Sequence, residues 1–321
     1  MNSKTPRVSI ILPNYNHEPF LRERLDTIIA QTFADWELII LDDCSGDRSM
    51  DVIREYAARE PRITHVIANE TNSGSTFRQW RKGIALASAP LIWIAESDDA
   101  AHPEFLEEAV GALDSSAGTG IVFCNSLLVD GKSEKLPLDL DCDDTAGKGT
   151  TFHDAKDFIR KKMLVNNRLY NASAVVFHRG LYEKVTTDLT RFRLCGDWVC
   201  WAQMIAASGQ VAWIHRKLNS FRQHTDKVTS QAKKNGMEML ERAEAAAIII
   251  GLAQPSWWKR NCMTGYNAVH ASRGAGYDRQ TQLQVLARWR DKFGFLLMPR
   301  LVFMMHAAIK RISGRRNDPY S

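Results

Sequence analysis

The sequence predicts an α/β protein with a mostly parallel sheet, helices on both faces of that sheet and a helical extension at the C-terminus. Over the first 125 residues, apolar runs of strand length alternate with segments of helical spacing, which is typical of parallel strands joined by helices. Residues 236–251 then repeat apolar side chains with a helical period. Of the 321 residues, 45% are hydrophobic and 25% charged, so the chain can bury a sizeable core and global disorder is excluded.

Five apolar runs have the length of buried strands. Asp42 and Asp43 follow the second run, and Glu96, Asp98 and Asp99 follow the fourth. Ligands of a parallel sheet bind beyond the carboxyl ends of its strands, so we expect both acidic groups at one binding edge. The runs cover residues 8–12, 36–41, 63–68, 91–95 and 121–124.

Helical spacing appears between these runs and again in the second half of the chain. Ser49 is a candidate N-cap, and Pro103 stands at a helix start, where its missing N–H costs nothing. Strand patterns return at 173–177, 211–214 and 218–221. The predicted helices cover residues 18–31, 49–59, 75–87, 103–113, 198–207 and 236–251.

The chain turns polar between about residues 130 and 157. The aspartates at 139, 141, 143 and 144 lack the glycine and glutamate positions of an EF-hand, so we expect a long surface loop and no calcium site. The six cysteines form no CxxC pair and no zinc-finger spacing, which favours reduced thiols in a cytosolic protein.

Several short motifs stand at the ends of predicted strands and helices. In the N-terminal half they read VSIILPNYN at 8–16, QTFADWELIILDDCS at 31–45 and IWIAESDD at 92–99. In the second half, CGDWVCW at 195–201 and FRQH at 221–224 follow. In this order the motifs resemble those of the family 2 glycosyltransferases, over roughly residues 6–126 and more weakly over 170–230.

This resemblance implies the GT-A fold and a division into domains. A GT-A domain over 1–230 would have a nucleotide-binding half over 1–126 and an acceptor half over 127–230, and a helical extension would follow over 231–321. The implied reaction is the inverting transfer of a hexose-type sugar from a nucleotide-sugar donor, first of all a UDP-sugar, to a cell-envelope glycan or a lipid-linked acceptor. Such a transfer needs a divalent cation, Mn²⁺ or Mg²⁺, at the leaving diphosphate and a base for the acceptor hydroxyl.

The resemblance places Pro13, Tyr15, Asn16 and Asp43 in the nucleotide site. Tyr15 is expected to stack near the nucleobase, and Asp43 to accept a hydrogen bond from a base N–H. A capped turn is the alternative for Asp43, since the residues that follow it have good turn chemistry. Asp42 is expected to be structural.

Glu96 and two arginines complete the nucleotide candidates. Glu96 stands where the family has the first Asp of its D-x-D motif, and its extra methylene leaves contacts with ribose, water or metal open. The spacing from Gly74 to Gly83 is one residue longer than in the family, so either Arg78 or Arg81 could face the nucleotide. An exposed helix face is the alternative for both arginines.

Asp98, Asp99 and His224 are the expected metal ligands. Carboxylate oxygens at a strand end suit a hard cation, and His224 matches the histidine of the family's R-x-H element. Asp99 could instead anchor the turn. Arg222, from the same element, is expected to contact the diphosphate or the acceptor.

Asp197 is the candidate general base, because it matches the aspartate at the helix start of the family's G-E-D-W-x-x-W segment. Gly196 replaces the glutamate that often precedes this aspartate, so one supporting carboxylate is missing. A helix N-cap is the alternative for Asp197. Trp198 is expected beside the diphosphate or the acceptor.

The C-terminal tail is basic within a chain whose net charge is +5. Residues 251–321 contain twelve Lys or Arg and three Asp or Glu. An apolar stretch at 293–309 is too short and too polar to span a bilayer. It fits an interfacial helix on an anionic membrane, with the protein peripheral on the cytoplasmic face of the inner membrane, or a helix packed on the core. No nucleic-acid-binding motif accompanies the cations.

Two rival functions fit parts of the pattern. A glycan- or nucleotide-binding module that kept the fold and lost its activity is supported by Glu96 and Gly196. A nucleotidyltransferase also uses acidic metal ligands on a related sheet, but the loop PNYNHEPF after the first strand lacks the glycines of such enzymes.

Overall fold

The computed structural model describes residues 5–138, 149–223, 236–273 and 277–312. The chain divides into two compact units. The first consists of Met1–Ala155, Leu169–Thr190 and Ala207–His224, and the second of Lys156–Arg168, Arg191–Ala206 and Thr225–Ser321. Two segments of the expected GT-A domain, 156–168 and 191–206, therefore group with the C-terminal helices, while the predicted domain boundaries stay a prediction.

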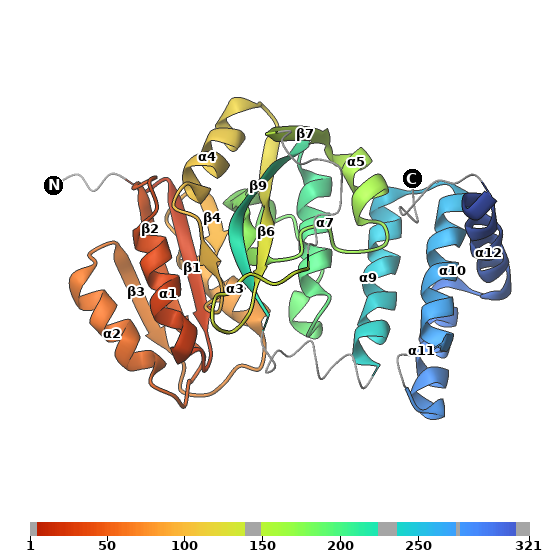
Figure 1. The fold of residues 1–321 in the computed structure, drawn as a ribbon, viewed down its shortest axis with the longest axis horizontal. Coiled ribbons are helices and arrows are strands. Elements are labelled where there is room, and N and C mark those ends of the chain that lie inside the picture. Colours follow the sequence, from red (N-terminus) through yellow and green to blue (C-terminus); the bar gives the residue numbers. More distant parts are fainter. Residues whose placement is uncertain (1–4, 139–148, 224–235, 274–276, 313–321) are drawn as a thin grey trace. The chain divides into compact units, whose positions relative to one another are not determined.

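A sheet of nine strands forms the described framework of the first unit (Figure 1). The strand order is β3-β2-β1-β4-β8-β6-β9-β5, and β7 also pairs with β9. The strands are β1 (Val8–Asn14), β2 (Trp36–Asp42), β3 (Ile63–Ala68), β4 (Leu91–Ile94), β5 (Ala100–Ala101), β6 (Thr119–Val129), β7 (Thr150–Asp154), β8 (Val175–His178) and β9 (Gln210–Arg222).

The four strands β1 to β4 are parallel, whereas the rest of the sheet is mixed. β8 runs antiparallel between β4 and β6, and β9 runs parallel to β6. The predicted α/β class is confirmed. The antiparallel insertion of β8 is a feature that periodicity does not reveal, because an apolar run carries no sign of its direction.

Helices cover both faces of the sheet, as predicted. One face buries Val8, Ile10 and Leu12 of β1 in a core that includes residues of three helices. The opposite face is covered by α3, which contacts β1 and β2. The helices on the first face are α1 (Glu18–Ile29), α2 (Ser49–Arg59) and α4 (Phe105–Ser115), and the helix on the opposite face is α3 (Thr76–Leu86).

Gly83 explains how closely α3 approaches the sheet. A Cβ atom at this position would lie 2.3 Å from Cγ2 of Ile11 and 3.2 Å from Cδ1 of Leu41. Ile11 and Ile10 point to opposite faces because side chains alternate along a strand. Only glycine allows this helix to sit against the apolar side chains of β1 and β2.

Two local expectations are corrected by the structure. Ser49 is the first residue of α2 and not its N-cap, and its backbone N–H donates to Oδ1 of Asp47 (2.9 Å). Within the region expected to be a surface loop, residues 150–154 form β7, which pairs with β9. The four clustered aspartates at 139–144 lie outside the described residues.

The second unit is helical in its described parts, which confirms the predicted C-terminal helices. Helix α11 packs on both α9 and α10, and α12 packs on α10. Gly265 of α10 marks that contact, since a Cβ there would lie 2.0 Å from the Pro299 carbonyl oxygen. The elements are η1 (Ile159–Met163), α7 (Gly196–Ala207), α9 (Met237–Ala253), α10 (Trp257–Arg273), α11 (Arg279–Phe293) and α12 (Leu297–Ile312).

Short elements complete the described chain. They are α5 (Ala155–Phe158), η2 (Ala172–Ala174), α6 (Arg179–Tyr182) and η3 (Leu189–Arg191). Among the helices that the structure describes, none combines the length and the hydropathy needed to cross a membrane.

Candidate functional site

The loops that follow β1, β2 and β4 meet at one edge of the sheet. These three strands are parallel, so their carboxyl ends point the same way. Asn14 and Asp42 face each other across β1 and β2, and the segment 96–99, here called the acidic loop, follows β4 directly. The expected binding edge is therefore formed.

Hydrogen bonds order the turns after β1 and β2. Oδ1 of Asp42 accepts from Nδ2 of Asn14 (2.8 Å) and from Oγ of Ser45 (2.6 Å), which agrees with the structural role expected for Asp42. Asn16 has φ of 55°, and its Oδ1 accepts from the Gly46 N–H (2.7 Å). Asn16 thus holds the two turns together.

Asp43 organises the segment that leads into α3. Its Oδ1 accepts from Nδ2 of Asn69 (2.6 Å), from the Ser73 N–H (2.9 Å) and from Nε2 of Gln79 (2.9 Å). Its Oδ2 accepts from Oγ of Ser73 (2.7 Å), and the side chain is buried. The turn alternative for Asp43 thus has direct support, and its contact with a nucleobase stays a prediction.

Pro13 and Tyr15 sit on either side of the end of β1. Pro13 is buried within the strand, whereas Tyr15 has 47% of its surface exposed. The exposed Tyr15 ring is therefore accessible for stacking on a flat ligand at this edge.

The acidic loop is held by polar groups from three other elements. Oε1 of Glu96 accepts from the Trp80 indole N–H of α3 (2.8 Å). Oδ2 of Asp99 accepts from Nδ2 of Asn171 (2.8 Å) and from Oγ of Ser173 (2.7 Å), and its Oδ1 accepts from the Arg222 N–H (3.0 Å). Asp99 is buried and engaged through both oxygens, which supports its turn-anchoring alternative. Asp98 is partly exposed.

Three carboxyl groups lie close together in the acidic loop. Burial raises the pKa of Glu96 to about 8, and the charge of Asp98 adds to the rise while the Trp80 bond opposes it. Burial, followed by the charge of Asp98, also raises the pKa of Asp99. A cation bound at this loop would relieve that repulsion.

Arg24 lies behind the acidic loop and was missed by sequence reasoning. Its guanidinium is fully buried 4.8 Å from the centre of the Trp93 ring, and its three nitrogens have no hydrogen-bond partner within the described chain. Burial lowers its pKa to about 10, against the opposing pull of the three carboxyls of the acidic loop. The one sequence signal was its position on the buried face of α1, between Leu21 and Leu25.

Arg222 clamps the acidic loop to its neighbours. Its Nε donates to the Asp98 carbonyl (2.7 Å), and its Nη1 donates to the Asp130 carbonyl (2.9 Å) and to Oγ of Ser133 (2.9 Å). Nη2 forms an ion pair with Glu23 (2.5 Å), and the side chain is only 1% exposed. The expected contact with a diphosphate or an acceptor would require these bonds to break.

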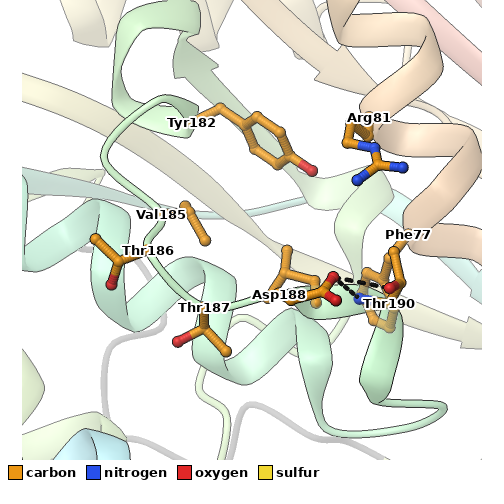
Figure 2. Close-up of a pocket in the computed structure, with 9 residues that line it drawn as sticks. Phe77, Arg81, Tyr182, Val185, Thr186, Thr187, Asp188 and Thr190 are labelled. Atoms are coloured by element: carbon orange, nitrogen blue, oxygen red, sulfur yellow. Dashed lines mark hydrogen bonds between the residues drawn. The ribbon is translucent and has the colours of Figure 1, made fainter.

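The two candidate arginines of α3 do not touch the acidic loop. Nη1 of the exposed Arg78 donates to the Ser73 carbonyl (3.1 Å). Arg81 lines a cavity of about 290 Å³ formed by α3 and residues 182–190. Figure 2 shows the Tyr182 hydroxyl directed toward the Arg81 guanidinium. It is Trp80, between the two arginines, that reaches Glu96, so the nucleotide roles of Arg78 and Arg81 stay predictions.

Asp197 lies in the first turn of α7, within the second unit. Its Oδ1 accepts from the Trp198 N–H (2.7 Å), and its Oδ2 accepts from Nδ2 of Asn167 (2.8 Å). An N-cap would instead accept from an N–H two or three residues ahead, so the N-cap alternative is wrong. Burial raises the pKa of Asp197 to about 7, while both hydrogen bonds oppose the rise. A carboxyl with this pKa is matched to proton abstraction near neutral pH.

The Trp198 side chain is bound to the backbone of its own unit, and its contact with the diphosphate or the acceptor stays a prediction. The Trp198 indole is buried, and its Nε1 donates to the Met163 carbonyl (2.9 Å). His224 lies outside the described residues. Among the residues that the structure does describe, no group of three or more His, Cys, Asp and Glu side chains is placed to hold a metal ion.

Comparison with known protein families decides the identity. A family model described as glycosyl transferase family 2 matches residues 9–184, which is more than half of the chain. The chain belongs to glycosyl transferase family 2. The matched range contains the turns after β1 and β2 and the acidic loop, whereas Asp197 lies beyond it.

Two curated relatives illustrate the similarity. The putative glycosyltransferase EpsH of Bacillus subtilis is 28% identical over 243 residues, which cover 73% of this chain and 66% of EpsH. The poly(ribitol-phosphate) beta-N-acetylglucosaminyltransferase TarS of Staphylococcus aureus is 29% identical over 110 residues, which cover 34% of this chain and 19% of TarS. The chain thus spans less than two thirds of the length of either relative.

Solved structures confirm the GT-A fold expected for family 2. The crystal structure of S. aureus TarS 1–349 in complex with UDP has a TM-score of 0.68 at 13% identity, covering 97% of this chain and 93% of that chain. The mannosyltransferase PcManGT from Pyrobaculum calidifontis, in complex with GDP-Man and Mn²⁺, has a TM-score of 0.53 at 16% identity, covering 99% and 78%. These likenesses concern the fold alone.

Proposed function

We propose that the chain transfers a sugar, with inversion, from a nucleotide-sugar donor to a glycan or lipid-linked acceptor of the cell envelope. The observation that carries this proposal is the acidic loop, which lies at the same sheet edge as the ordered turns after β1 and β2. Family membership supports the reaction class. The name of TarS supports an envelope polymer as acceptor, and its structures with UDP and with UDP-GlcNAc support a UDP-sugar as donor.

In this proposal Tyr15 and Asp43 form the nucleoside end of the donor site. The exposed Tyr15 ring offers a stacking face, and Asp43 fixes the 69–79 segment on the other side. The buried carboxylate of Asp43 already accepts four hydrogen bonds, so a base N–H would add a fifth or replace one of them. Pro13 and Asn16 shape the turn that carries Tyr15.

The residues of the acidic loop fit a divalent cation, Mn²⁺ or Mg²⁺. When bound, such an ion supplies the positive charge that offsets the charge developing on a departing diphosphate. Asp98 is the ligand that the chain offers, because its carboxylate is partly exposed beside two repelling carboxyls. Asp99 anchors the loop, and Glu96 is oriented by Trp80. The structure of PcManGT with Mn²⁺ supports the choice of metal. His224 remains a predicted ligand.

Asp197 is the proposed general base. It would take the proton from the attacking acceptor hydroxyl as that oxygen bonds to the anomeric carbon of the donor sugar. The partly buried carboxylate, with one oxygen held by Asn167 and the other by the Trp198 N–H, keeps a fixed orientation for this transfer.

Donor binding tests the proposal directly. UDP-, GDP- and dTDP-sugars, each with Mn²⁺, Mg²⁺ or EDTA, are compared for thermal shift and for hydrolysis of the donor. A ligand at one hundred times its Kd adds about 2.7 kcal/mol to the free energy of unfolding, so the true donor should raise Tm by a few degrees only with metal. Donor binding without any turnover would favour the inactive binding module, which the family departures at Glu96 and Gly196 support. No shift with any nucleotide would exclude the donor site.

We further propose a peripheral position on the cytoplasmic face of the inner membrane, through α12. Five residues of one α12 face, here called the apolar stripe, are each 46% to 60% exposed. The sequence then continues with cations at 310, 311, 315 and 316, which complement anionic lipid. The stripe consists of Leu297, Met298, Leu301, Met304 and Met305.

Vesicle sedimentation tests this surface. The protein should sediment with anionic phosphatidylglycerol vesicles and remain in solution with neutral phosphatidylcholine, and Met304→Glu with Met305→Glu should abolish sedimentation. Leu283→Glu is the matched control, because Leu283 is 60% exposed on α11 but lies outside the stripe. Undiminished sedimentation of the double variant would disprove the assignment. The protein could instead fail to sediment with either kind of vesicle and form a dimer. If the double variant is then monomeric, a second copy of the chain covers the stripe.

A further inference from the structure

Helix α9 binds the backbone just before α7 through one carboxylate. Oε1 of Glu241 accepts from the Arg193 N–H (2.7 Å), and its Oε2 accepts from the N–H groups of Leu194 (2.8 Å) and Cys195 (3.0 Å). Three consecutive backbone donors are thereby fixed by one charged side chain. Charge-assisted bonds of this kind are stronger than neutral ones, so the approach to Asp197 is held firmly.

The next residue of α9 binds a second segment. The Arg242 Nη2 donates to the Val165 carbonyl and to Oδ1 of Asn166, and its Nε donates to Oδ1 of Asn267 (2.8 Å). Its guanidinium carbon lies 5.3 Å from the centre of the Trp198 ring. Arg242 thus ties the 165–166 segment to α10 and contacts the residue after Asp197.

The partners of Asp197 follow these two segments closely in the chain. Asn167, directly after the segment that Arg242 holds, donates to Oδ2 of Asp197, and Trp198 donates its N–H to Oδ1. Each oxygen of the carboxylate is therefore oriented by a residue that lies one to three positions after a segment held by α9. All of these residues belong to the second unit.

We propose that Glu241 and Arg242 of α9 are positioning residues for Asp197. This inference rests on the proposed function, in which Asp197 is the base. It also accounts for Gly196, where the family often has a glutamate: Glu241 supplies a supporting carboxylate from a helix beyond the family-matched residues 9–184. The C-terminal helices would then be part of the catalytic machinery and not only an extension.

Charges around Asp197 give the proposal a specific electrostatic signature. Burial is the main cause that raises the pKa of Asp197, and the negative charge of Glu241 raises it further. The thiols of Cys195 and Cys200 also face this carboxylate, and burial raises their pKa so far that they stay neutral at working pH. The charge of Glu238 also raises the pKa of the Cys195 thiol, whereas the charge of Arg242 lowers it. Within this group, Asp197 is the side chain that titrates near pH 7.

The first test is Glu241→Gln in the full chain, with Glu244→Gln as the matched control. Glu244 lies one turn further along α9 and pairs with Arg191, Arg288 and Lys292 at the surface. Glu241→Gln should lower kcat about tenfold, leave the donor KM unchanged and move the acidic limb of the pH profile to lower pH. The control should change none of these. An unchanged kcat and an unchanged limb in Glu241→Gln would overturn the proposal.

A readout independent of turnover separates this inference from the proposed function. The Trp198 amide donates to Asp197, so its ¹⁵N–¹H NMR shift should report the titration of that carboxyl. Glu241→Gln should lower the midpoint of this titration, and an unmoved midpoint sinks the inference even if the wild type is active. Absence of donor turnover with a shifted midpoint sinks the proposed function instead. If Glu241→Gln does not fold, Arg242→Lys serves as the second variant, with the same unchanged donor KM, reduced kcat and altered Trp198 titration expected.

Discussion

Asp197→Asn should lower kcat by about 10³-fold and leave donor binding unchanged. General-base catalysis contributes about 10²- to 10⁴-fold to enzymatic rates, and an amide cannot take a proton from the acceptor hydroxyl. The substitution keeps an oxygen for the Trp198 N–H and is nearly equal in volume, so the first turn of α7 should persist. The measurement is steady-state kcat and KM together with the Kd of the donor.

The matched control for Asp197 is Asp278→Asn. Asp278 also stands at a helix start, where it is the N-cap of α11 and accepts from the Thr281 N–H (2.7 Å), and asparagine serves equally well there. This variant should keep full activity. A near-normal rate in Asp197→Asn would show that Asp197 is not the base. A loss of donor binding as large as the loss of rate would show that Asp197 is structural.

The pH dependence of the wild type follows from the same carboxyl. Because the base must be ionised, kcat should rise with pH and level off above about 7. Stability should change in the opposite sense: between its ordinary pKa and about 7 the folded state binds the proton more tightly than the unfolded state, so stability falls as pH rises through this window. The Tm advantage of Asp197→Asn should therefore be largest at pH 8 and shrink toward pH 5.

Asp98→Asn should abolish metal-dependent turnover while making the free protein more stable. A metal at the diphosphate supplies several kcal/mol of transition-state stabilisation, so the rate should fall by about 10³-fold or more. In the free protein, Asp98 repels Glu96 and Asp99 across a desolvated loop, and removing one charge relieves that repulsion. The expected pair of results is a lost Mn²⁺ dependence of donor binding and a higher Tm without ligand.

The control for Asp98 is Asp51→Asn in the same unit. Asp51 is 71% exposed on α2 and pairs with Arg54, so its loss should affect neither metal dependence nor Tm measurably. Titration with Mn²⁺ in the presence of UDP, by calorimetry, distinguishes the two variants. Unchanged Mn²⁺ affinity in Asp98→Asn would remove the metal assignment.

The sequence alone determined the α/β class, the parallel strands of the N-terminal half and the edge at which the acidic groups lie. These features follow from local periodicity and from the rule that parallel strands share one carboxyl edge. The motif at 195–201 likewise singled out Asp197. Each of these inferences uses only residues that are close in the sequence, or the regular α/β arrangement that their periodicity predicts.

Only the tertiary structure decided which polar side chains are already engaged. Arg222 meets partners from residues 23 to 133, Arg24 lies buried behind the acidic loop, and Glu241 reaches the backbone before α7 from 46 to 48 residues away. A charged side chain has the same sequence signature whether it faces a ligand or another part of the chain. Its role depends on burial and on long-range hydrogen bonds, which no local pattern records.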